Sequence, residues 1–150
     1  ESGFRLEGGH QYEYSFLKGY MNFMDIFIFH SLLENTNKIE YNNEINDILK
    51  CVTINLYAKK GILSQIGGVD GVKKIPGCTL VLIHSREGEV CDDDNAILHK
   101  LGMFSFCHES PEYLKECVEK AYSLLEFKDE NNNDMVYDRI DTRIILDWWK

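Results

Sequence analysis

The spacing of apolar residues changes near Cys51, and this change restricts the folds open to the chain. From there on, Val52, Ile54 and Leu56 alternate with polar neighbours. Successive side chains of a β-strand point to opposite faces, so a period of two predicts a strand with one buried face. Further β-like runs at residues 78–85 and 99–108, and a shorter one at 62–67, predict that these strands form a mostly antiparallel sheet.

A helix is predicted after the last of these runs. Ser110 suits the N-cap, Pro111 the first turn, and Glu112 lies where the helix dipole favours an acid. Apolar residues then recur at spacings of three and four, namely Leu114, Cys117, Val118, Ala121, Leu124 and Leu125. We expect this helix to end near Phe127. With a short helix over 69–75, the region after residue 50 is predicted to be an α+β lobe, a small antiparallel sheet covered on one face by two helices.

Residues 20–46, which precede Cys51, lack the alternation of a strand. Residues 20–34 form the most apolar stretch, with a helical period, and the asparagine-rich segment 35–46 predicts a boundary between two parts. The apolar stretch, about 15 residues long, contains Asp25 and His30, so it is too short and too polar to span a bilayer. We therefore divide the chain into residues 1–50 and residues 51–150.

The first ten residues carry the pattern with the most chemical content. In an extended strand Glu1, Gly3 and Arg5 project from one face, and the Gly8-Gly9 pair then allows a sharp turn before His10. A carboxylate is a ligand for a hard cation such as Mg²⁺, and a guanidinium binds phosphate or carboxylate in a bidentate manner. The pattern predicts a metal-and-phosphate edge; a solvated ion pair with no chemical role is the alternative that these residues leave open.

Glu1-x-Gly3-Phe4-Arg5, followed by Gly8-Gly9, resembles the last active-site strand of ATP-grasp ligases. The resemblance implies that Glu1 binds magnesium and that Arg5 faces the phosphoryl or acyl-phosphate group as a catalytic residue. Gly3 stands where the family usually has asparagine. Gly8, Gly9 and His10 would then belong to a loop near the substrate or phosphate.

A second set of segments resembles the C-terminal lobe of ATP-grasp amino-acid ligases, and the chain as a whole resembles amino-acid ligases or carbamoyl-phosphate-synthase-like ATP-grasp proteins. It comprises residues 61–68, 72–78, 86–90 and 101–103, followed by the Ser110-Pro111-Glu112 helix start. The resemblance implies that residues 1–50 end an ATP-grasp catalytic domain and that residues 51–150 form a C-terminal lobe with a tail. No counterpart is assigned to the residues after about 126.

The function implied by the resemblance is ATP- and Mg²⁺-dependent activation of a small-molecule carboxylate as an acyl phosphate, which an amine then attacks. The chain begins inside a motif and without Met, so we expect a fragment that lacks an N-terminal part and is inactive alone. The alternative from another class is a non-catalytic α+β module for small-molecule binding or subunit contact. The sequence leaves open whether the chain forms a homo-oligomer.

Charge and cysteine content restrict the partners and the compartment. The net charge of −9 argues against a nucleic-acid surface, and neither a signal peptide nor a membrane partner is indicated. Five widely spaced cysteines predict free thiols in a reducing cytoplasm. Zinc is disfavoured because the cysteines and histidines lack closely spaced pairs; these residues are Cys78, His84, Cys91, His99, Cys107 and His108.

Overall fold

The computed structural model describes residues 32, 49–92 and 99–148. The chain divides into two compact units, Glu1–Leu49 and Lys50–Lys150, and nearly all of the described residues belong to the second unit. Asp25 and His30 lie outside the described residues. The assignment of residues 1–50 to the end of a catalytic domain therefore stays a prediction.

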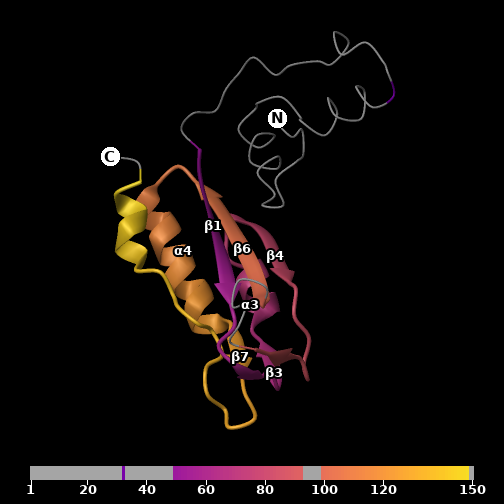
Figure 1. Ribbon diagram of the computed structural model, residues 1–150. Coiled ribbons are helices and arrows are strands. Elements are labelled where there is room, and N and C mark those ends of the chain that lie inside the picture. Colours follow the sequence, from indigo (N-terminus) through magenta and orange to yellow (C-terminus); the bar gives the residue numbers. More distant parts are fainter. Residues whose placement is uncertain (1–31, 33–48, 93–98, 149–150) are drawn as a thin grey trace, which may run out of the picture. The chain divides into compact units, whose positions relative to one another are not determined.

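A three-stranded antiparallel sheet forms the centre of the second unit (Figure 1). Its strands lie in the order β1 (Lys50–Tyr57), β6 (Lys100–His108) and β4 (Cys78–Ile83). In the middle strand, Phe104 lies opposite Ile54 of β1 and opposite Val81 of β4. Residues 101–107 of β6 are all buried, because the strand has a neighbour on each side.

The two predicted helices are present and share one apolar core with the sheet. These are α3 (Val69–Lys73), which packs against β4, and α4 (Pro111–Leu124), which packs against β6, β1 and α3. As predicted, Ser110 caps α4, its hydroxyl accepting from the Tyr113 N–H at 3.1 Å. The mixed α+β fold, with a small antiparallel sheet and two helices, is thus confirmed. The helices bury their apolar stripes against the sheet residues Val52, Ile54, Leu56, Phe104 and Phe106.

Two local predictions were wrong, both because of pairing between distant segments. The strand predicted over 62–67 is divided: β2 (Gly61–Ile62) pairs with β5 (Val90–Cys91), whereas β3 (Gln65–Gly67) pairs with β7 (Glu126–Lys128). The helix predicted to reach Phe127 ends at Leu124. An extended backbone after Leu124 lets β7 pair with β3 and buries the Phe127 ring completely.

The residues after β7 fold back along the unit. The Asp129 carboxylate accepts from the Asn131 and Asn133 N–H groups, each at 2.8 Å, and its hydrogen bonds to Asn133 above all lower its pKa. The 3₁₀ helix η3 (Thr142–Leu146) then packs beside α4 and buries Ile145 (Figure 1). Ile145 is fully buried, whereas Trp148, which follows the helix, is 49% exposed.

Gly68 and Gly88 offer a matched test of how closely α3 and α4 pack. Both have positive φ, 78° and 85°, but only at Gly68 would an added Cβ overlap the backbone carbonyl of Leu124; at Gly88 nothing lies within 4 Å. We expect Gly68→Ala to lower the free energy of unfolding by about 3 kcal/mol or more, since a clash adds to the backbone strain. Gly88→Ala should lower it by only about 1 kcal/mol, the cost of the left-handed backbone alone.

Urea unfolding of the two variants beside the parent chain measures this difference. Equal losses at the two positions would contradict the packing described for Gly68.

Candidate functional site

The residues predicted to bind metal and phosphate lie outside the part of the chain that the structure describes. These are Glu1, Gly3, Arg5, Gly8, Gly9 and His10. Their roles stay predictions. The described unit does contain the other segments that carry the resemblance. Their geometry shows which of their side chains hold the fold together.

The glycine turn at residues 86–89 folds over the segment that follows β2. The Leu63 N–H donates to the Glu89 carbonyl at 2.9 Å, and the Gly88 N–H donates to the Leu63 carbonyl at 2.6 Å. The Glu87 carboxylate accepts from the Ile66 N–H at 3.0 Å, and that of Glu89 from the Arg86 N–H at 3.0 Å. Two segments that carry the resemblance are thus brought together. Both carboxylates already accept backbone N–H groups, so their observed role is to hold the turn.

The glycines at 67–71 serve helix packing. Gly68, in the left-handed conformation, immediately precedes α3, and a Cβ on Gly71 would touch the Leu124 side chain at 3.4 Å. Because Gly68 and Gly71 have no side chains, the start of α3 can approach the end of α4 closely. The segment therefore forms the turn that leads into α3.

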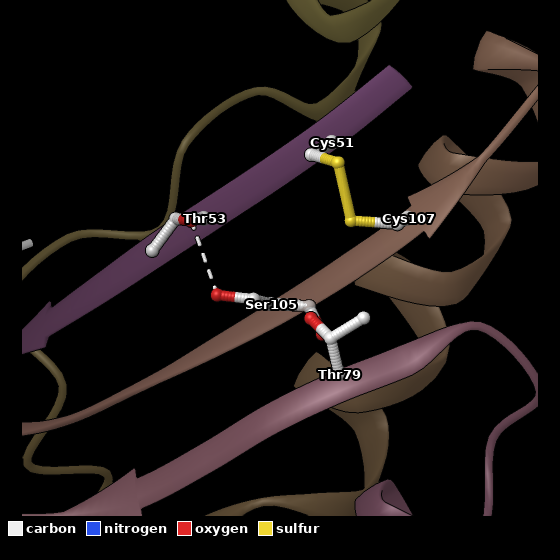
Figure 2. The surroundings of a disulfide bond; sticks show 5 residues. All are labelled: Cys51, Thr53, Thr79, Ser105 and Cys107. Carbon is white, nitrogen blue, oxygen red and sulfur yellow. Dashed lines mark hydrogen bonds between the residues drawn. A yellow bond between two sulfur atoms is a disulfide. The ribbon is translucent and has the colours of Figure 1, made fainter. Parts of the chain in front are cut away.

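The face of the sheet opposite the helices carries a pair of cysteines. Cys51 and Cys107 lie directly opposite each other on β1 and β6 and form a disulfide, with a Cα–Cα distance of 4.2 Å (Figure 2). On the same face, the Thr53 and Ser105 hydroxyls share a hydrogen bond of 3.1 Å. The expectation that all five cysteines are free thiols was therefore wrong for this pair. The two are 56 residues apart, so only the strand register shows that they meet.

Three cysteines are free, namely Cys78, Cys91 and Cys117. Burial raises the pKa of the Cys78 and Cys117 thiols, and burial together with the negative charge of Glu89 raises that of Cys91. A thiol with a raised pKa is mostly protonated near neutral pH, and the protonated form is a poor nucleophile. The raised pKa values therefore make all three thiols weak nucleophiles near neutral pH.

The histidines considered as zinc ligands have separate local partners. His108 accepts from the Ser110 N–H at 3.1 Å through Nδ1, and its ring packs on Tyr113 at a centroid distance of 4.3 Å. His99 accepts from the Asp92 N–H at 3.2 Å through Nε2. Within residues 49–92 and 99–148, no three histidine, cysteine or acidic side chains gather as ligands of one metal ion.

The disulfide is the feature that sequence reasoning missed. One signal was present: Cys51 stands just before the first predicted strand, and Cys107 near the end of the run at 99–108. Antiparallel pairing of those strands places the start of one beside the end of the other. Without the register, however, the residues facing each other cannot be identified.

Comparison of the chain with models of known protein families, with characterised proteins and with solved structures gave no match. Among the helices of the described unit, none combines the length and the apolar character needed to cross a bilayer.

Removing either partner of the Cys51–Cys107 disulfide should lower the free energy of unfolding. Since the bond closes a loop between residues 56 positions apart, Cys51→Ala and Cys107→Ala should each cost about 2–4 kcal/mol under oxidising conditions. The double variant should be hardly less stable than either single variant, because the first substitution already removes the bond.

Denaturant unfolding with and without dithiothreitol measures both effects. Cys78→Ala serves as control, since it removes a free thiol and should keep the stabilisation that reductant abolishes. Additive losses from the two cysteines would show that they act independently.

Proposed function

We propose that this chain is the C-terminal part of an ATP-grasp ligase that uses ATP and Mg²⁺ to activate a carboxylate and join it to an amine. The proposal rests on the sequence patterns at residues 1–10 and 61–112. The substrates would be small molecules, with amino acids as the first candidates, and the compartment would be the cytoplasm.

The described unit supplies one observation in support. Among the described residues, the segments at 61–68, 72–78, 86–90 and 101–112 contribute, in that order, strand residues, the end of a short helix, a turn, and a strand followed by a capped helix. β2 begins at Gly61-Ile62, α3 is followed by Pro76-Gly77, β4 is followed by the Gly88 turn, and α4 starts after Ser110. In this proposal the unit is the C-terminal lobe of the ligase.

The chemistry is assigned to the first residues of the chain. Mg²⁺ held by Glu1 would neutralise phosphate charge, because carboxylate oxygen is a preferred ligand of this ion. The Arg5 guanidinium would stabilise the charge that develops on the transferred phosphoryl group. Preorganised charges of this kind act mainly in the transition state, so their loss lowers turnover more than it weakens nucleotide binding.

The test of the proposal is a coupled ADP-release screen of the full-length protein over pairs of amino acids. The proposal predicts ADP formation that needs Mg²⁺ and both substrates, and a product whose mass equals that of the two acids less water. A folded full-length protein that releases no ADP with any pair and binds no ATP would favour the alternative, a non-catalytic module.

Arg5 provides the sharpest single-residue prediction. In the full-length protein, Arg5→Ala should lower kcat by about 100-fold or more while ATP affinity changes little. Arg5→Lys should restore activity only in part, because a point charge does not reproduce the planar fork of the guanidinium. Steady-state kinetics and ATP titrations separate the two effects.

Arg143→Ala is the matched control, since this side chain is 82% exposed and pairs locally with Asp141 in the tail. Its kcat should stay near that of the parent. If Arg5→Ala left turnover within about twofold in a folded protein, Arg5 would be a solvated partner of Glu1 rather than a catalytic residue.

A further inference from the structure

The two cysteines of β1 and β6 meet because of the sheet register. Cys51 lies opposite Cys107, and their Cα–Cα distance of 4.2 Å is that of a non-hydrogen-bonded antiparallel pair, where facing side chains approach most closely. Val52 and Phe106, which adjoin the cysteines, point to the other face, toward the core. The thiols are therefore neighbours before any bond joins them.

The strand β1 is held in place without the disulfide. Val52, Ile54 and Leu56 are 1%, 4% and 2% exposed and belong to the same core as Phe104 and Phe106. The ladder between β1 and β6 continues over the length of β1, with one irregularity near its end. Since this burial does not involve sulfur, the unit should keep its fold when the disulfide is reduced.

The positions of the five cysteines favour a disulfide between Cys51 and Cys107 over any other pairing. Cys51 is half-buried, whereas Cys107, Cys91 and Cys117 are buried. The reaction with an external reagent is therefore assigned to Cys51, and Cys107 reacts only with its neighbour across the strand pair. Cys78 is half-buried as well, but it packs with the core on the other face of the sheet. No other cysteine of the described unit lies opposite a cysteine in a strand pair.

We propose that Cys51 and Cys107 form a reversible thiol–disulfide switch that fastens the start of β1 to the end of β6. This inference does not depend on the proposed ligase activity. The co-reactant is a small-molecule disulfide. The Cys51 thiolate attacks one of its sulfurs and releases one small thiol; the Cys107 thiolate then attacks the Cys51 sulfur of the mixed disulfide and releases the second. Two protein thiols are oxidised, and one small disulfide is reduced to two thiols.

The bond joins the first residues of the unit to the segment that leads into α4. Lys50 donates from Nζ to the Glu109 carbonyl at 2.9 Å, and Ser110 caps α4. In the oxidised state, Lys50 and Cys51 are tied to this segment both covalently and through the hydrogen bond. In the reduced state, only noncovalent contacts remain, so the start of β1 should open locally more often.

The experiment is a redox titration of the chain in mixtures of reduced and oxidised glutathione. Samples are quenched in acid and alkylated, and the mass of the intact chain gives the number of free thiols. We expect one two-electron step between five and three alkylated cysteines, and peptide mapping should assign the step to Cys51 and Cys107. Cys51→Ser and Cys107→Ser should abolish the step, whereas the control Cys78→Ser should keep it.

A second measurement separates a switch from a permanent crosslink. Circular dichroism of the reduced chain should match that of the oxidised chain, while hydrogen exchange of residues 50–53 should become about tenfold faster or more on reduction and stay faster than that of Phe104, because residues 50–53 open locally and Phe104 exchanges only when the core opens. The proposal is overturned if the disulfide can be reduced only after the chain unfolds. It is equally overturned if both thiols stay reduced in excess oxidised glutathione, or if the step maps to another pair.

Discussion

The compact unit depends on one constraint, the pairing of β6 on both of its edges. This strand is buried along its length because β1 and β4 flank it and α4 packs on one of its faces. Phe104 and Phe106 lie at the centre of the core and make an edge-to-face contact, with ring centroids 5.7 Å apart. The helices α3 and η3 pack in turn against β4 and α4, so the register of β6 positions them as well.

One register determines both faces of the sheet. Because side chains alternate along a strand, the pairing that places Ile54 opposite Phe104 in the core also places Thr53 opposite Ser105 on the other face. It likewise brings Cys51 to Cys107. A slip of one residue would put polar groups into the core and separate the cysteines. The disulfide is therefore a product of the same apolar alternation that builds the core.

Local patterns predicted the elements whose causes are local. The alternation after Cys51 and the spacing of apolar residues after Ser110 predicted β1 and α4, because burial of one face and a capped start both appear in neighbouring residues. Pairing over long separations could not be predicted: β7 replaces the last turn of the expected helix because it meets β3. The predicted site at Glu1 and Arg5 comes from the chemistry of a short motif and lies outside the described residues.

The register of β1 and β6 can be measured directly by nuclear Overhauser effects in the isotopically labelled chain. Facing residues of a non-hydrogen-bonded antiparallel pair bring their Hα atoms close together. The structure predicts strong Hα–Hα effects between Thr53 and Ser105 and between Asn55 and Met103. Strong Hα–Hα effects linking Thr53 to Phe104 or Phe106 would mean a register shifted by one residue and would contradict this account of the core and of the disulfide.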